Sequence, residues 1–237
     1  MSRPWSTVRI VDIGEPLVPI PADALALRSP HPYKAVGAPY DKLNVDPFVL
    51  RKGTCERLVL AQKTLQERHP TLKLSIFDAY RPLEVQQYMV DYTFRDLSGG
   101  VDAEQLDEGQ REKILQQVHQ FWAKPNHDLS APPPHSTGSA VDLTLMDVTT
   151  EEELDMGSPI DELSERSYPN HFAENLKGGK VFHERRELLK TVMQEVGFKQ
   201  HPQEWWHFSY GDQMWAYFCG LEGSQEECHA LYGRVLG

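Results

Sequence analysis

The chain has 237 residues, of which 40% are hydrophobic and 25% are charged, an ordinary composition for a globular protein that excludes wholesale disorder. No uninterrupted apolar stretch approaches the ~20 residues of a transmembrane helix, and the chain is long enough to bury a core without a disulfide or a metal. The net charge of −11 makes a nucleic-acid backbone or an anionic bilayer a poor partner, and favours the simpler interpretation that it keeps the protein soluble.

Cysteine usage and the N-terminal sequence bear on the compartment. The three cysteines, Cys55, Cys219 and Cys228, cannot all pair within one chain, and no C-x-x-C motif occurs. Residues 1–16 lack a basic start followed by an apolar core, so they do not resemble a signal peptide. Both features predict a cytoplasmic protein.

The first hundred residues predict an arm followed by helix, strand and helix. Residues 1–53 carry many prolines and glycines and little periodicity, which indicates an extended N-terminal arm with short strands. A helix is expected over 54–68, with Thr54 as its cap. Alternating apolar residues then predict a half-buried strand over 72–76. The next helix is expected over 82–97, because proline is favoured in a first helical turn.

The second half continues the mixture of helices and strands. Helices are expected over 103–123 and 183–196, and strands over 139–145 and 205–210. Between them, 146–181 is acidic and irregular, and so long a connection is often functional. Helices and strands that mix without regular alternation predict an α+β fold. We expect a single compact domain in which helices pack around a central, mostly antiparallel sheet.

The segment 135–142, HSTGSAVD, is the first cluster that could do chemistry. His135 follows three prolines, and Asp142 lies between apolar residues of the predicted strand. A buried charge on a strand is costly unless it is paired or bound to a metal, and imidazole and carboxylate are both zinc ligands. Taken alone, the cluster is slightly more typical of a surface aspartate on an edge strand near a surface histidine.

The segment 204–207, EWWH, is the second cluster. In an ideal strand Glu204 and His207 would lie on opposite faces, so they converge only if Glu204 lies in the preceding loop. Pro202 favours a loop there. A third zinc ligand beside a carboxylate base is typical of metallohydrolases. For the histidine alone, an aromatic core segment with a hydrogen-bonded imidazole is the alternative.

The segment 78–82, DAYRP, is the third cluster. Arg81 follows the predicted strand and precedes the predicted helix, where a guanidinium can donate two parallel hydrogen bonds to an oxyanion or a carboxylate. The alternative is a salt bridge with Asp78 or Asp91.

Together, in this order, the clusters resemble the zinc D-alanyl-D-alanine dipeptidases, the VanX-like branch of the M15 metallopeptidases. The resemblance runs from about residue 72 to 215. Its motifs are DAYRP at 78–82, HSTGSAVDLTL at 135–145, DMGSPID at 155–161, SERS at 164–167 and EWWHFSYGDQMWA at 204–216.

The resemblance implies a role for each matching residue. His135, Asp142 and His207 would bind one zinc ion per chain. Glu204 would be the general base and Arg81 would stabilise the tetrahedral oxyanion. Asp161 would hold the free ammonium group of the substrate, with 146–181 as a substrate loop region.

The implied activity is zinc-dependent hydrolysis of the free dipeptide D-Ala-D-Ala to D-alanine, a reaction of peptidoglycan chemistry. The implied partner is therefore a small dipeptide, with no nucleic acid and no membrane insertion, while the oligomeric state stays open. Two alternatives remain: a D,D- or L,D-peptidase of the same fold that acts on larger peptidoglycan peptides, and a non-catalytic zinc-binding module.

The sequence departs from the family pattern at one pocket position. The family usually carries a serine two residues before the first zinc histidine, and here that residue is Pro133. Proline offers neither a hydroxyl nor a backbone N–H, so the departure bears on substrate choice rather than on the zinc ligands.

Overall fold

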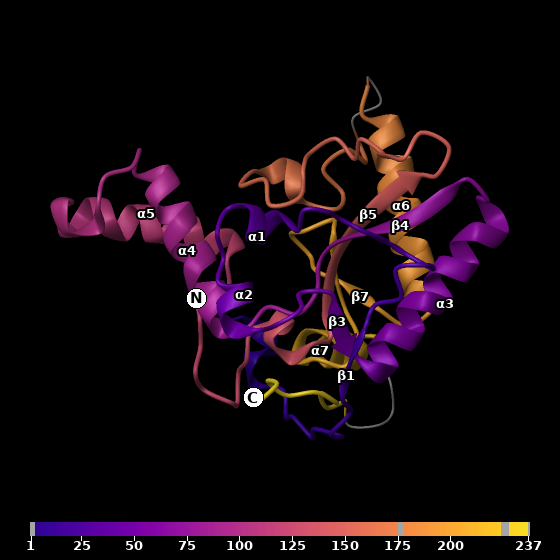
Figure 1. Ribbon diagram of the computed structural model, residues 1–237, viewed down its shortest axis with the longest axis horizontal. Coiled ribbons are helices and arrows are strands. Elements are labelled where there is room, and N and C mark those ends of the chain that lie inside the picture. The colour runs from indigo at the N-terminus through magenta and orange to yellow at the C-terminus, as the bar shows by residue number, and fades with distance from the viewer. Residues whose placement is uncertain (1–2, 175–177, 224–227, 237) are drawn as a thin grey trace.

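A computed structural model describes residues 3–174, 178–223 and 228–236 (Figure 1). Residues 175–177 of the predicted 146–181 segment lie outside the described residues. The helices, including 3-10 turns marked η, are η1 Pro4–Thr7, α1 Pro32–Ala35, α2 Tyr40–Leu43, α3 Lys52–Arg68, α4 Leu83–Leu97, η2 Ala103–Gln105, α5 Glu108–Phe121, η3 Pro134–Thr137, η4 Glu165–Ser167, α6 Lys180–Glu195 and α7 Gln213–Leu221. The strands are β1 Leu17–Pro19, β2 Ala26–Leu27, β3 Val49–Arg51, β4 Leu72–Asp78, β5 Ala140–Asp147, β6 Glu152–Glu153, β7 Lys199–Gln200 and β8 His207–Ser209.

The main sheet confirms the predicted α+β class. Within the described residues its strand order is β2-β4-β5-β8-β7, and β6 pairs with β5 beyond the end of β8. Among the strand pairs that the structure describes in this sheet, β2–β4 alone is parallel and the others are antiparallel. Across the described residues, no helix combines the length and the hydropathy needed to cross a bilayer.

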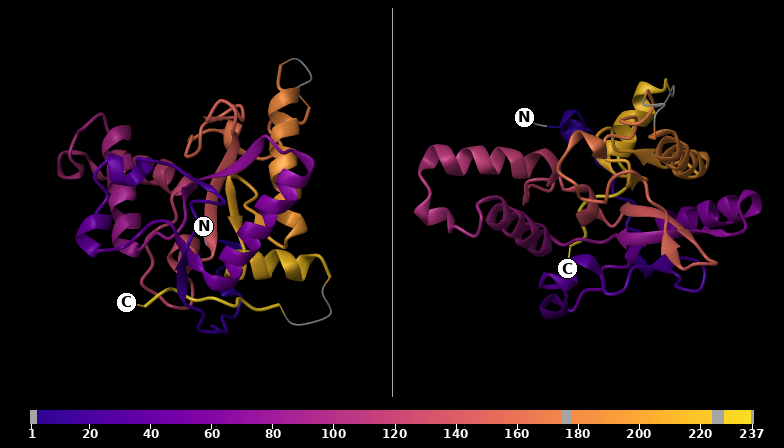
Figure 2. Two further views of the ribbon diagram at one scale, coloured as in Figure 1. Left: turned by 45° about the vertical axis from the view of Figure 1, so that its right-hand side comes forward. Right: turned by 90° about the horizontal axis from the view of Figure 1, so that it is seen from above.

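Two apolar clusters form the core. The larger lies where α3 and α6 pack on the sheet, with Leu58, Leu143 and Leu189 among its members. The smaller includes Tyr33, Val85 and Val118 and lies between the N-terminal segment and the α4–α5 pair, which projects to one side of the sheet in both Figure 1 and the right-hand view of Figure 2.

Two local expectations were wrong. Helix α3 begins at Lys52, so Thr54 lies inside the helix, fully buried, and its Oγ1 donates to the carbonyl of Tyr210 at 3.4 Å instead of capping the helix. Strand β4 is not half-buried, because Ser75 on its polar face is covered as well and donates to Glu153 Oε1 at 2.9 Å. Both errors arise from tertiary contacts that a local pattern does not contain.

Helix α5 is shorter than expected. The predicted helix over 103–123 is divided, because Asp107 and Gln110 form a capping box that starts α5 at Glu108. Helix α6 runs up to the glycine stop at Gly197, which takes the left-handed φ of 97° that favours glycine.

Candidate active site

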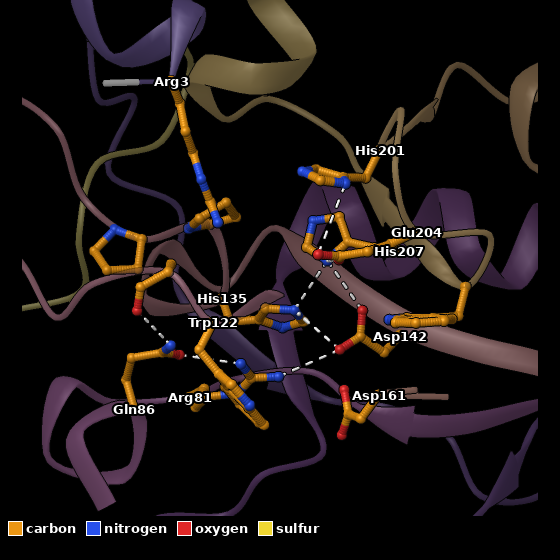
Figure 3. A pocket seen from close by; sticks show the side chains of 14 residues that line it. Arg3, Arg81, Gln86, Trp122, His135, Asp142, Asp161, His201, Glu204 and His207 are labelled. Carbon is orange, nitrogen blue, oxygen red and sulfur yellow. Dashed lines mark hydrogen bonds and ion pairs between the residues drawn. The ribbon is translucent and has the colours of Figure 1, made fainter. Parts of the chain in front are cut away.

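The side chains of His135, Asp142 and His207 converge on one buried point of the main sheet (Figure 3). Asp142 on β5 is the direct register partner of His207 on β8, and His135 lies in η3 just before β5. One candidate ligand atom from each residue lies within 4.8 Å of the other two. His207 Nδ1 is 3.0 Å from Asp142 Oδ1, and His135 Nε2 is 3.1 Å from His207 Nδ1.

The ring orientations fit a metal ion. His135 Nδ1 lies 2.7 Å from the carbonyl oxygen of Ala79, which can only accept, so Nδ1 carries the proton and Nε2 turns its lone pair toward the cluster. His207 Nε2 lies 3.3 Å from Ser209 Oγ, which leaves Nδ1 on the cluster side. Two nitrogens and one carboxylate, oriented by outer partners, are a donor set that suits zinc.

The carboxylate of Asp142 stays ionised despite its burial. Burial by itself would raise the pKa of Asp142, but the adjacent imidazoles of His135 and His207 lower it well below its usual range. An ionised, buried oxygen donor is what a cation site requires.

Glu204 lies in the turn between β7 and β8, beside the three candidate ligands. Its Oε2 is 3.7 Å from His207 Nδ1, and its Oε1 is 3.7 Å from His201 Nδ1. Because Glu204 lies in this turn and not in β8, it can approach His207, which the two residues could not do on opposite faces of one strand. Burial raises the pKa of Glu204, a shift in the direction that suits a group that must accept and return a proton.

Arg81 is held firmly at the end of β4. Its Nε donates to Asp78 Oδ2 at 3.0 Å, its Nη1 to Gln86 Oε1 at 3.0 Å and its Nη2 to Asp142 Oδ2 at 3.3 Å. The guanidinium also lies against the rings of Tyr33 and Trp122. The salt bridge with Asp78, considered as an alternative, is therefore present, and it fixes Arg81 beside the cluster.

Asp161 lies on another wall of the same pocket. Its φ of 65° is left-handed, a sparsely populated conformation for a residue with a side chain. Its Oδ2 accepts from the Tyr33 hydroxyl at 2.9 Å. Burial, with the charge of Asp142 adding to it, raises the pKa of Asp161 to about 7, so a cationic partner would stabilise the ionised form.

Sequence reasoning missed three residues around the site. Tyr33 bridges Asp161 and Arg81, to which its hydroxyl is 2.9 and 3.1 Å away. His31 Nε2 is 3.0 Å from Asp78 Oδ1 and helps to hold the carboxylate that accepts from Arg81. His201 packs its ring 5.6 Å from that of His207. Of these three residues, only His201 lies next to a predicted motif in the sequence, because it precedes Pro202 and is close to Glu204.

The pocket lies where the two apolar clusters meet, since Trp206 of one and Trp122 of the other both line it. An α+β fold with two imidazoles and a carboxylate around one point, and a second carboxylate beside them, is typical of single-metal hydrolases.

The chain belongs to the D-Ala-D-Ala dipeptidase family of peptidases. The family model described as Peptidase_M15, D-ala-D-ala dipeptidase, matches residues 28–221. A D-alanyl-D-alanine dipeptidase of Synechocystis sp. is 44% identical over 98% of this chain and 97% of its own length. A D-alanyl-D-alanine dipeptidase of Enterococcus faecalis is 26% identical over 75% of this chain and 80% of its own.

Among solved structures, VanYB in complex with D-alanine-D-alanine aligns with a TM-score of 0.45 at 16% identity, over 94% of this chain and 99% of that one. The family assignment rests on the sequence matches.

Proposed function

We propose that this protein hydrolyses the free dipeptide D-Ala-D-Ala to two molecules of D-alanine, with one zinc ion per chain. The observation that carries the proposal is the convergence of His135, Asp142 and His207 beside Glu204, in a pocket that also holds Asp161. Membership of the dipeptidase family supports the substrate, and the donor set supports the metal.

The zinc ligands would be His135 Nε2, His207 Nδ1 and a carboxylate oxygen of Asp142. When bound, zinc would act as a Lewis acid and would lower the pKa of a coordinated water molecule toward about 7. The hydrogen bond from His135 to Ala79 and the contact between His207 and Ser209 keep both rings in the ligating orientation before any metal arrives.

The protein's own groups then move the protons and stabilise the charge. Glu204 accepts a proton from the water that attacks the amide carbonyl and returns it to the leaving amine. Arg81 donates to the developing oxyanion, and its bonds to Asp78 and Gln86 hold its plane so that little reorganisation is needed.

Asp161 makes the enzyme a dipeptidase rather than an endopeptidase. Its carboxylate accepts from the free ammonium group of the substrate, and the Tyr33 hydroxyl keeps it aimed into the pocket. An N-terminal extension would remove that ammonium and meet the 146–181 segment. This distinguishes the proposal from a peptidase of larger peptidoglycan peptides.

The test uses zinc-loaded protein and three substrates: D-Ala-D-Ala, N-acetyl-D-Ala-D-Ala and a pentapeptide stem ending in D-Ala-D-Ala. Released alanine is measured. The proposal expects cleavage of the free dipeptide alone. Preferential cleavage of the pentapeptide would favour a larger-peptide enzyme, and a zinc-replete protein inert on all three would favour a zinc-binding module.

The partners and the cellular location of the protein are further predictions. The ligand we propose is a small dipeptide, and no contact with nucleic acid is expected from the charge of −11. A cytoplasmic location, predicted from the cysteine usage and the N-terminal residues, would be checked by fractionating cells that produce the protein.

A further inference from the structure

A second arginine faces the pocket and has no part in the steps above. Arg3 lies just before η1, outside the segment 28–221 that matches the family model. Its side chain nevertheless reaches into the pocket, which it lines together with Pro133, Pro134 and Glu204, and Figure 3 shows it extending from the N-terminal segment toward the metal-ligand cluster.

The guanidinium of Arg3 has hydrogen-bond donors that no acceptor among the described residues uses. Among the described residues, its side chain forms no hydrogen bond or ion pair. Its Cζ lies over the Trp5 ring, 5.9 Å from the ring centroid. Arg81 on the far side is instead bonded to Asp78, Gln86 and Asp142. The charges of Glu204 and Asp212 act on the half-buried guanidinium without a hydrogen bond to it, so its donors stay available, and a carboxylate that entered the pocket would be bound favourably there.

The N-terminal segment holds Arg3 in place before any ligand binds. The adjacent Trp5 is buried, and its ring packs 5.6 Å from that of His201 and 6.0 Å from that of Phe218 on α7. Gln213 Nε2 donates to the carbonyl of Val8 at 2.6 Å. These contacts reduce the ordering cost that a free arginine would otherwise add to binding.

We propose that Arg3 binds the C-terminal carboxylate of the dipeptide, as a specificity residue for the proposed reaction; the inference rests on the proposed function. Arg3 and Asp161 lie on opposite sides of the cluster in Figure 3, an arrangement that suits a substrate with an ammonium group at one end and a carboxylate at the other. Arginine can donate two parallel hydrogen bonds to a carboxylate.

The proline at position 133 fits this assignment. Pro133 lines the same pocket, and it can donate nothing through either its side chain or its backbone nitrogen. Arg3 supplies donors to the same pocket from another part of the chain. The site therefore selects peptides with a free carboxylate on the second residue and discriminates against amides and C-terminal extensions.

The test compares D-Ala-D-Ala with D-Ala-D-Ala amide, which lacks the carboxylate. Arg3→Gln should raise KM for the acid by about 10- to 100-fold with kcat nearly unchanged, because a charge-assisted pair is lost. The same substitution should lower kcat/KM for the amide far less than for the acid. Arg9→Gln, which removes an exposed arginine from the same segment, is the matched control, and Arg3→Lys should restore part of the affinity.

A binding measurement separates this inference from the proposed function. Calorimetric titration of D-Ala-D-Ala into zinc-loaded Glu204→Gln protein, with and without Arg3→Gln, needs no turnover. Arg3-dependent binding without hydrolysis by the wild-type protein would contradict the proposed function alone. Equal losses for acid and amide, no loss for either, or binding that ignores Arg3 would overturn the carboxylate assignment.

Discussion

Asp142 shows at the scale of one residue why this site needs a cation. Its sequence neighbours Val141 and Leu143 are fully buried and apolar, and Asp78 and Asp161 bring two further carboxyl groups to the same region. Arg81 is shared between Asp78 and Asp142, so it balances only part of that charge. A divalent metal at the cluster would balance the rest.

Replacement of the proposed base separates chemistry from metal binding. Glu204→Gln keeps the shape of the side chain but accepts no proton, so kcat should fall by about 10²- to 10⁴-fold while zinc content is unchanged. Alanine release and metal analysis on the same sample check both. Glu67→Gln, an exposed change of the same kind on α3, should have no effect. A Glu204→Gln protein with normal turnover would remove Glu204 from the base role.

Asp161 should control the demand for a free amine. Asp161→Asn removes the negative charge that faces the substrate ammonium, so KM for D-Ala-D-Ala should rise by roughly 10-fold or more. Discrimination against N-acetyl-D-Ala-D-Ala should shrink accordingly, as measured by the ratio of kcat/KM values. An unchanged ratio would show that another group selects the amine.

The motif residues and the supporting residues differed in how well the sequence could predict them. His135, Asp142, Glu204 and His207 lie in short motifs whose order is distinctive. Tyr33 and Asp161 are 128 positions apart in the chain, so no local sequence pattern predicts the contact between them. Arg3 lies outside the segment that carries the resemblance.

At the scale of elements, three neighbouring strands place the site. Asp78 on β4 is the register partner of Asp142 on β5, and Asp142 is in turn the partner of His207 on β8. The register shifts between Ile76 and Asp78, which brings Asp78 level with the others. The sequence predicted strands at β5 and β8 but contained no information on which of their residues would face each other.

Gly138 sets the path of the chain from His135 to Asp142. Its φ is 72°, and an added Cβ would collide with Leu17 of the N-terminal arm. Gly138→Ala should therefore destabilise the protein by about 1–3 kcal/mol and weaken zinc binding.

Gly99 provides the matched control for that substitution. It also has a left-handed φ, 66°, but open space lies around its missing Cβ. Thermal unfolding and competition with a zinc chelator should show a larger loss for Gly138→Ala than for Gly99→Ala. Equal effects would mean that backbone strain alone, and not the contact with the arm, matters at Gly138.

At the scale of the whole molecule, Arg51 joins segments distant in sequence. Its Nε donates to the carbonyl of Thr137 at 2.9 Å, next to the metal-ligand turn. Its Nη2 donates to the carbonyl of Gly233 at 3.2 Å and contacts Asp12 Oδ2 at 3.3 Å. One buried arginine thus ties the arm and the C-terminal segment to the loop that carries His135.

Loss of these Arg51 contacts should lower the thermal stability of the entire fold. Arg51→Ala leaves the buried carbonyl groups of Thr137 and Gly233 without this donor, so Tm should fall by roughly 6–12 °C. Scanning calorimetry of the zinc-loaded protein measures it. Arg95→Ala, an exposed change on α4, should shift Tm little. A Tm for Arg51→Ala equal to that of the control would show that the three segments hold together without it.

We propose that one zinc ion, held by His135, Asp142 and His207, makes this protein a D-Ala-D-Ala dipeptidase. The most direct measurement is a zinc titration of chelator-treated protein, with bound metal and released D-alanine followed in the same samples. We predict no hydrolysis without metal and a linear rise in D-alanine release that ends at one zinc per chain. Turnover by metal-free protein, or one bound zinc with no hydrolysis of D-Ala-D-Ala, would contradict it.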